Sequence, residues 1–173
     1  MNSTISGNMA QAAGGLKLYG PTNIVDSSIK NNTTVYGAAG IGNRGTTVIT
    51  GSIISRNQSS GGGGGIDNLG TLTISESILS DNRASDGAGI SNRGILHLAN
   101  STVSGNVSGD GGGIWHGSYH TMNISNSTIT GNRASTGGGI HIDGRGSSLS
   151  ITNTTITNNI ADDVGRGQRE AIS

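Results

Sequence analysis

The chain has 173 residues, ten basic and ten acidic side chains and a formal net charge of zero, and it contains no Cys. Its length suits a single domain, the absence of Cys excludes a disulfide framework, and no apolar run is long enough to span a membrane. The balanced charge and the few aromatic residues, one Trp and three Tyr, argue against a groove or stacking platform for nucleic acid.

The segment at residues 2–8 returns almost unchanged at residues 126–132, and its last residue belongs to a row of Asn that recurs every 24 to 27 residues. A period of this size is typical of stacked supersecondary units. The row consists of Asn8, Asn32, Asn57, Asn82, Asn106, Asn132 and Asn159. Because residues 2–8 correspond to the second half of a unit, we expect the chain to begin mid-coil. It would then be a piece of a longer protein, or its open N-terminal coil would make an end-to-end contact with another chain.

Each unit carries three apolar signals in a fixed order. The first is a Gly followed by an aliphatic residue, at Gly15, Gly40, Gly65, Gly89, Gly113 and Gly139. The second is an aliphatic pair two residues apart, at Leu72 and Ile74, Leu96 and Leu98, Met122 and Ile124, and Leu149 and Ile151. The third lies three residues before each Asn, at Ile5, Ile29, Ile54, Leu79, Val103, Ile129 and Ile156.

The apolar residues alternate with Ser, Thr and Asn, and this period of two predicts short strands with one buried face. The abundance of Gly and of β-branched residues argues against helices. One unit has a face to bury and nothing of its own to bury it against, so like units stack and each strand pairs in parallel with its counterpart one repeat away. We therefore predict an all-β fold, a single parallel β-helix of six to seven coils of 24–27 residues over residues 1–160. At the usual strand spacing the rod would be roughly 30 Å long.

The repeated polar residues predict structural rows at the bends of the coils. An Asn at the same bend of every coil can bond its amide to the amides above and below, and it tolerates the left-handed backbone of a sharp bend. We expect the Gly before each aliphatic residue to serve the same left-handed backbone. A Ser or Thr five residues before each Asn is expected to point inward at a narrow corner. The Asn row is thus predicted to be a ladder and not a ligand site.

Gly-Gly-Gly-Ile at residues 111–114 and 137–140, followed by Ile-x-x-Asn at 129–132 and 156–159, resembles the repeats of polymorphic outer-membrane proteins. More broadly, residues 2–160 resemble right-handed β-helix proteins of the pectate-lyase-like superfamily, with Ile, Leu or Val where the outer-membrane repeats usually have Phe. The resemblance, together with the coil length, implies a right-handed helix. It also implies a secreted or cell-surface bacterial protein, with polysaccharide or another surface protein as its partner.

Enzymes on this scaffold use acidic clusters on one face, and the acidic residues of this chain rarely share a register. Asp86 and Asp110 fall near the same bend of adjacent coils. This pair has two possible interpretations: the carboxylates bind a cation, or they lie in a solvated loop. Residues 62–69 fit a calcium-binding nonapeptide, but the pattern does not recur every nine residues, as that site requires. We therefore expect no catalytic residue, no metal and no cofactor.

The densest group of aromatic and His residues lies in coils five and six, around a loop longer than its neighbours. By register, His141 is expected to stack over Trp115 one coil away. His suits divalent metals and a flat Trp suits a sugar ring, but no tetrahedral ligand spacing is present. The candidate ligand-binding residues are Trp115, His116, Tyr119, His120, His141, Asp143 and Arg145.

The last segment, residues 161–173, is charged and leaves the repeat pattern, so we expect a partial cap or a disordered tail. Three functions remain open. The first is a structural or interaction module without catalysis, and the second is a β-helix that binds or cleaves a polysaccharide. The third is an ice-binding solenoid, whose outward Thr and Ser array would be interrupted at Lys30, Ile53 and Ile78.

Overall fold

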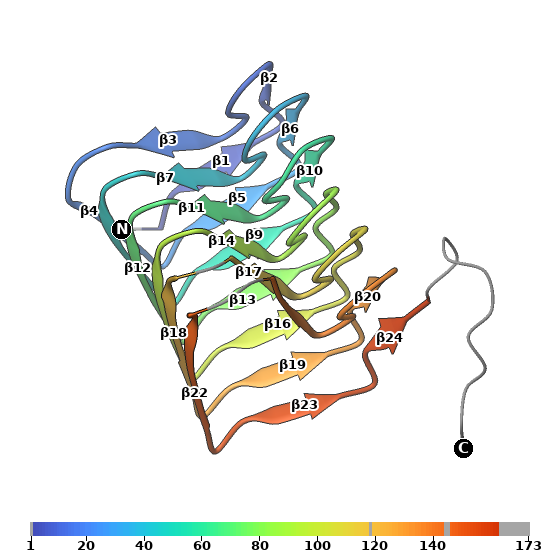
Figure 1. Ribbon diagram of the computed structural model, residues 1–173. Coiled ribbons are helices and arrows are strands. Elements are labelled where there is room, and N and C mark those ends of the chain that lie inside the picture. Colours follow the sequence, from blue (N-terminus) through green and yellow to red (C-terminus); the bar gives the residue numbers. More distant parts are fainter. Residues whose placement is uncertain (1, 118, 144–145, 163–173) are drawn as a thin grey trace, which may run out of the picture.

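The computed structural model describes residues 2–117, 119–143 and 146–162, and these residues form a parallel β-solenoid of about six coils (Figure 1). Every pairing between the strands is parallel, and each strand pairs with the equivalent strand of the next coil. The predicted all-β fold and the number of coils are confirmed. Among the described residues no helix is long and apolar enough to cross a bilayer.

Three long sheets run the length of the stack, and we name each by its first strand. The β1 sheet comprises β1 (Thr4–Ser6), β5 (Ser28–Lys30), β9 (Ile53–Ser55), β13 (Ile78–Ser80), β16 (Thr102–Ser104), β19 (Thr128–Thr130) and β23 (Thr155–Thr157). The β3 sheet comprises β3 (Leu16–Leu18), β7 (Ile41–Asn43), β11 (Ile66–Asn68), β14 (Ile90–Asn92), β17 (Ile114–His116) and β21 (Ile140–Ile142). The β4 sheet comprises β4 (Thr22–Val25), β8 (Thr46–Thr50), β12 (Thr71–Ser75), β15 (Ile95–Ala99), β18 (Thr121–Ser125) and β22 (Ser148–Thr152).

Two-residue strands add a fourth, interrupted side after five of the seven ladder Asn residues. They are β2 (Met9–Ala10), β6 (Thr33–Thr34), β10 (Gln58–Ser59), β20 (Arg133–Ala134) and β24 (Ile160–Ala161). Ala161, which we assigned to the C-terminal segment, therefore still belongs to the last coil. Residues 163–173, the rest of the predicted cap or tail, lie outside the described residues.

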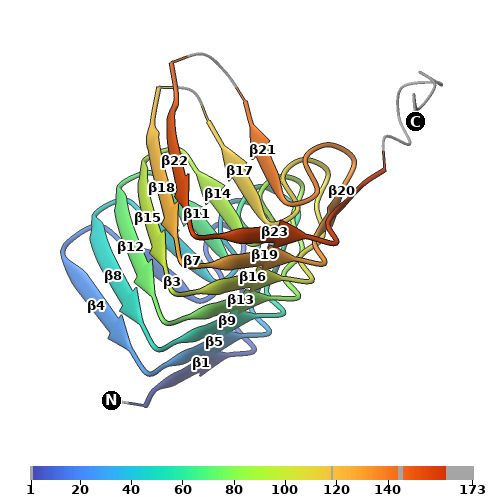
Figure 2. The ribbon, with the colours of Figure 1, turned by 90° about the horizontal axis from the view of Figure 1, so that it is seen from below.

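The three long sheets surround the inside of the stack (Figure 2). Alternate residues of each strand face this inside, and these inward rows build the core. In the middle coils these side chains are fully buried. The rows include Ile29, Ile54, Leu79, Val103 and Ile129 from the β1 sheet, and Ile41, Ile66, Ile90 and Ile114 from the β3 sheet. They also include Ile49, Leu72, Ile74, Leu96, Leu98, Met122 and Ile124 from the β4 sheet. Each row is a continuous aliphatic stripe, as the apolar signals of the repeat predict.

The Asn row forms the predicted ladder. The backbone N–H and the side-chain Nδ2 of Asn57 both donate to Oδ1 of Asn82, over 3.0 and 3.1 Å, and Nδ2 also donates to the carbonyl of Ile29, over 3.0 Å. Asn82 makes the same contacts to Asn106. The ladder Asn side chains from Asn32 to Asn132 are completely buried. The row therefore satisfies buried backbone groups and closes the corner between coils.

The left-handed backbone at this bend was assigned to the wrong residue. Positive φ occurs at the residue before each ladder Asn, for example 54° at Arg56 and 56° at Asp81, and not at the Asn itself. Two neighbouring residues therefore have different roles at this bend. The exposed residue before the Asn adopts the left-handed turn, and the Asn, in ordinary backbone, points inward to its neighbours.

Our reason for the Gly before each aliphatic residue was also wrong. Gly89 has no positive φ, but a Cβ on it would lie 2.4 Å from the carbonyl oxygen of Gly113 in the next coil. Positive φ is found two residues earlier, at Gly87, with 55°. Gly89 is therefore required because the coils approach closely there, and Gly87 because the chain turns.

The hydroxyl row behaves as predicted. Ser52 and Ser77 are buried, and Oγ of Ser77 accepts the backbone N–H of Ser52 over 3.1 Å while it donates to the carbonyl of Ser75 over 2.7 Å. The corner between the β4 and β1 sheets therefore holds a small side chain. Its hydroxyl accepts a backbone N–H of the preceding coil and donates to a backbone carbonyl of its own coil.

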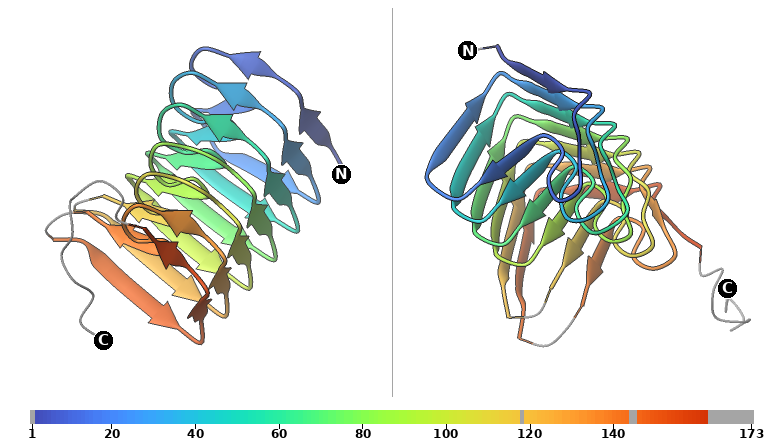
Figure 3. Two further views of the ribbon diagram at one scale, coloured as in Figure 1. Left: turned by 90° about the vertical axis from the view of Figure 1, so that its right-hand side faces the viewer. Right: turned by 90° about the horizontal axis from the view of Figure 1, so that it is seen from above.

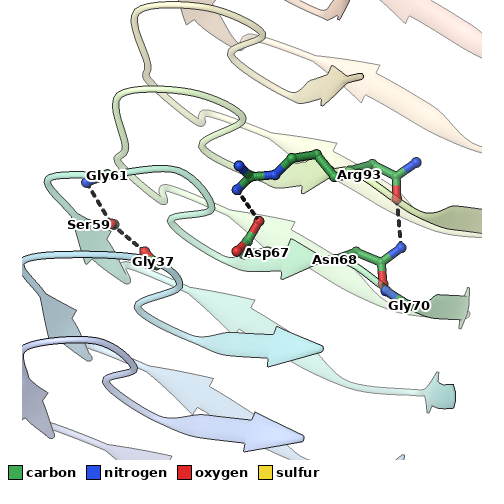
Figure 4. A network of polar contacts seen from close by, with 8 residues as sticks. Gly37, Ser59, Gly61, Asp67, Asn68, Gly70 and Arg93 are labelled. Carbon is green, nitrogen blue, oxygen red and sulfur yellow. Dashed lines mark hydrogen bonds and ion pairs between the residues drawn. The ribbon is translucent and has the colours of Figure 1, made fainter. Parts of the chain in front are cut away.

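A second amide row, which the sequence analysis missed, lies at the end of the β3 sheet. Nδ2 of Asn43 donates to Oδ1 of Asn68 over 2.8 Å, and Nδ2 of Asn68 donates to Oδ1 of Asn92 over 2.6 Å. Oδ1 of Asn68 also accepts the backbone N–H of Gly70, as Figure 4 shows. The row continues to His116 one coil on, where Nδ2 of Asn92 lies 2.9 Å from Nδ1 of the imidazole.

Candidate functional site

The outward positions of the β3 sheet form a column of six residues with different chemistry in every coil; Gly42 has no side chain, and Asp67 and Ser91 are buried. Register pairs them one above the next. In order they are Lys17, Gly42, Asp67, Ser91, Trp115 and His141. The inward residue before each of them is always aliphatic, so this column, which we call the outer column, varies on a constant scaffold. The predicted stacking of His141 over Trp115 is confirmed by the pairing of β17 and β21.

Gly-rich bend loops lie close against one side of the outer column. A Cβ on Gly63 would come within 2.7 Å of Cβ of Asp67, and one on Gly137 within 2.6 Å of Cβ of His141. The loops themselves are aligned by bridges from Gly62 to Asp86, from Asp86 to Asp110 and from Asp110 to Thr136. Two side-chain columns, one on the loops and one on the sheet, therefore run side by side along the rod.

An ion pair joins two coils within this surface. Arg93 reaches across one coil, and its guanidinium lies 2.8 Å from Oδ1 of Asp67 (Figure 4). The carboxylate is nearly buried and the guanidinium is half-exposed. Asp67 is the acidic residue of the calcium-like segment 62–69, and the structure uses it as an ion-pair partner for Arg93.

The loop column brings two carboxylates together at adjacent coils, as their register predicts. Burial raises the pKa of the Asp86 carboxyl, and the neighbouring Asp110 carboxylate raises it further, while Arg93 and His141 oppose the shift. The hydroxyl of Thr136 donates to Oδ1 of Asp110. Asp110 therefore has a hydrogen-bond partner, and its charge acts on Asp86.

Thr136 connects this pair to the outer column. Its Oγ1 lies 3.1 Å from Nδ1 of His141. Because the single hydroxyl proton of Thr136 is directed to Asp110, the ring nitrogen Nδ1 must be the donor in this contact. Neutral His141 then carries its proton on Nδ1, which leaves Nε2 as an acceptor. The group is a short polar chain from imidazole through hydroxyl to carboxylate.

Trp115 is half-buried on the same surface, beside a loop that connects β17 to β18. A Cβ on Gly117 would lie 3.0 Å from the Trp115 ring and 3.5 Å from Cγ of Arg93, so the indole and the arginine stem both border Gly117. Tyr119 is highly exposed in the same loop, and His120 is half-buried. We call Trp115 and His141, which register places on adjacent coils, together with Tyr119 and His120 of the loop after β17, the aromatic patch.

His116 does not share this surface. It is the next residue after Trp115 on a strand, so it faces inward, and it is completely buried at the end of the second amide row. Burial lowers the pKa of its imidazole, and the backbone of His120 partly opposes this lowering. Its Nε2 atom is buried and has no hydrogen-bond partner among the described residues. The period of two in β17 was the signal that could have placed His116 inside.

The remaining predicted residues lie at the margin. Asp143 is exposed just after β21, and its backbone N–H donates to the carbonyl of His116 over 2.8 Å. Arg145 lies outside the described residues. The residues the structure does describe contain no group of three or more His, Cys, Asp or Glu side chains that could hold a metal ion.

The other end of the outer column borders a small cleft that the sequence analysis missed. The cleft has a volume of about 210 Å³, and its lining includes Lys17, Tyr36, Arg44 and Asp67. Lys17 also lies over the ring of Tyr19, with Nζ 5.5 Å from the ring centre. These residues come from three coils and occupy different positions of the repeat, so no local sequence motif predicts the cleft.

A family model described as "Right handed beta helix region" matches residues 1–165. The chain belongs to the right-handed β-helix family. The predicted hand of the β-helix is thereby confirmed. Searches of curated proteins and of solved structures give no significant match. The family defines the scaffold of this β-helix, and its surface residues must supply the argument for function.

Proposed function

We propose that this β-helix is a structural and interaction module of a secreted or cell-surface bacterial protein, and that it acts by presenting side chains and not by catalysis. The observation that carries the proposal is the contrast between the two sides of the β3 sheet. The inward row is aliphatic in every coil, from Leu16 to Ile140, while the outer column changes in every coil from Lys17 to His141. A constant interior with a variable exterior is what a presenting scaffold requires.

The location outside the cell is supported by the likeness of the repeats to those of bacterial surface proteins. The partner class that follows is another surface protein or a polysaccharide. Protease treatment of intact cells of the source organism tests the location, since a surface module is digested while cytoplasmic proteins are protected.

Polysaccharide binding is the second candidate function, and the aromatic patch favours it. Trp115 is partly exposed, and the imidazole of His141, which Thr136 links to the carboxylate of Asp110, offers ring nitrogens for hydrogen bonds. Sugar rings bind to such mixtures of an apolar face and hydrogen-bonding groups. The outer column runs along the rod, so an extended chain could contact several coils.

Affinity electrophoresis of the protein in gels that contain neutral or acidic polysaccharides separates the two candidates. The matched variants are Trp115→Ala and His141→Ala, with Val48→Ala on the β4 sheet as a control away from the patch. A module that binds another surface protein and no polysaccharide is expected to give equal mobility for the wild type and all variants in every gel. Retardation of the wild type that is lost in Trp115→Ala and kept in Val48→Ala would establish sugar binding. Release of reducing or unsaturated sugar ends would refute the non-catalytic proposal.

A further inference from the structure

The hydrogen bonds of the Asn ladder all point the same way along the rod. In each step, the backbone N–H and Nδ2 of one Asn donate to Oδ1 of the Asn in the following coil. The first step runs from Asn8 to Asn32 and the last from Asn132 to Asn159. The end of the stack at β1 therefore offers an acceptor, Oδ1 of Asn8, and the end at β23 offers donors on Asn159.

The hydroxyl row has the same direction. The backbone N–H of Ser27 donates to Oγ of Ser52 over 3.1 Å, and at the other end the N–H of Ser127 donates to Oγ1 of Thr154 over 3.4 Å. The two ends of the described stack are thus complementary to each other. Neither end is complementary to itself, because two β1 ends would place amide oxygen against amide oxygen.

Both end faces also expose inward aliphatic rows that are buried elsewhere. At the β1 end, Ile5, Leu16 and Leu18 are only partly buried, and with Ile24 they line a cavity of about 430 Å³. At the β23 end, Leu149, Ile151 and Ile156 are 39, 40 and 45% exposed. The equivalent residues of the middle coils are at most 1% exposed.

The rows and the strands at the two ends match one another. Ile156 belongs to the row that begins at Ile5, and Ile151 to the row that begins at Ile24. Three of the four pairs of edge strands are equal in length, namely β23 and β1, β21 and β3, and β24 and β2, while β22 and β4 have five and four residues. Figure 3 shows these two edges at opposite ends of the stack.

We propose that the β23 end of one molecule binds the β1 end of a second copy of this chain, so that the ladder and the apolar rows continue across the contact. The pairing is heterologous, because the two contacting surfaces differ. An assembly of any length therefore keeps one free β1 end and one free β23 end. Such a contact produces open linear assemblies and not a closed dimer. The alternative is that a further segment of the same polypeptide covers either face. The experiment below distinguishes this alternative from a second copy of the chain.

Two end-blocking variants test the direction of assembly. Ile5→Lys places a charge in the β1 face and leaves the β23 face intact, and Ile156→Lys does the reverse. Ile53→Lys is the matched control, because Ile53 lies on the same sheet and is 45% exposed, as is Ile156, but it faces sideways. Far-UV circular dichroism verifies that each variant keeps its strands.

Sedimentation velocity from low to high micromolar concentration gives the result. We expect the chain of 173 residues and Ile53→Lys to increase in mass continuously with concentration, and each end-blocked variant alone to stay a monomer. An equimolar mixture of the two end-blocked variants must form a one-to-one dimer and stop there. A monomeric wild type at all concentrations would show that another segment of the chain covers an end face, and would overturn the proposal. Dimers of either blocked variant alone, or loss of assembly in Ile53→Lys, would overturn it as well.

Discussion

Replacing Asn82 by Ala tests whether the ladder stabilises the fold. Asn82 is completely buried, and the ladder gives it five hydrogen bonds: two accepted from Asn57, two donated to Asn106 and one donated to the carbonyl of Ile54. In Asn82→Ala the backbone N–H of Asn57 and one N–H of its Nδ2 both lose their acceptor inside the rod. A buried polar group without a partner costs about 1–3 kcal/mol.

Two such groups, with the small cavity that Ala leaves, predict a loss of about 3–5 kcal/mol in the free energy of unfolding. The measurement is urea denaturation followed by far-UV circular dichroism. Asn8→Ala is the matched control, because Asn8 is exposed and its side chain only donates, to Asn32. Its loss should be about 1 kcal/mol or less. Equal losses in the two variants, or a loss below about 1 kcal/mol in Asn82→Ala, would refute the view that the ladder satisfies buried groups.

Asn82→Asp sharpens this test, because it keeps the shape of the side chain and replaces the donor Nδ2 by an oxygen. That oxygen would face Oδ1 of Asn106 and the carbonyl of Ile54, which are both acceptors. We expect Asn82→Asp to be less stable than Asn82→Ala at neutral pH, and to recover part of the difference in acid, where the carboxyl is protonated and can donate again. No recovery in acid would mean that packing, and not the direction of the hydrogen bonds, decides the stability.

Two further variants address His116 and Gly89. Because burial lowers the pKa of His116 in the folded state, the unfolded chain binds this proton first, and stability held above about pH 6.5 should be lost as the pH falls below it. His116→Asn should reduce that loss in denaturation curves at about pH 7.5 and about pH 5.5, one unit either side of the ordinary His pKa of about 6.5; an unchanged difference between the two pH values would contradict it. The raised pKa of Asp86 acts in both proteins and cancels in the comparison. Gly89→Ala should cost about 3 kcal/mol by overpacking against Gly113, whereas Gly131→Ala, where a Cβ meets nothing nearer than 3.9 Å, should cost about 1–2 kcal/mol for its positive φ alone; similar losses would contradict the contact.

The sequence predicted those features that a single coil repeats. The Asn row, the inward aliphatic rows and the hydroxyl row all recur at fixed intervals, because each must meet its own copy one coil away. The detailed backbone was not predictable in the same way. Asp81 and not Asn82 adopts positive φ, and Gly87 and not Gly89 makes the turn. Both outcomes depend on where the neighbouring coil lies, and the repeat alone does not distinguish the two residues of either pair.

The candidate surface was predicted only in part, for a related reason. The stacking of Trp115 and His141 follows from register and was found. Thr136 lies one repeat after Asp110 and in register with it, but its contact with His141 joins a loop to a strand of the same coil, and no period in the sequence relates those two positions. The second amide row was hidden because its fourth member is His116 instead of Asn.

The amide ladder has a role that the aliphatic rows cannot perform. A strand of period two can shift by two residues along its neighbour and still present Ile or Leu to the core, so apolar burial specifies the register only weakly. The Asn82 amide has no such freedom, because a shift would separate its donors from Oδ1 of Asn106 and leave them buried without partners. Register is therefore set at the corners, by groups whose hydrogen bonds also have a direction. With register fixed inside, the outer column can change from Lys17 to His141 without disturbing the stack, and the surface chemistry of this β-helix is free to differ from coil to coil.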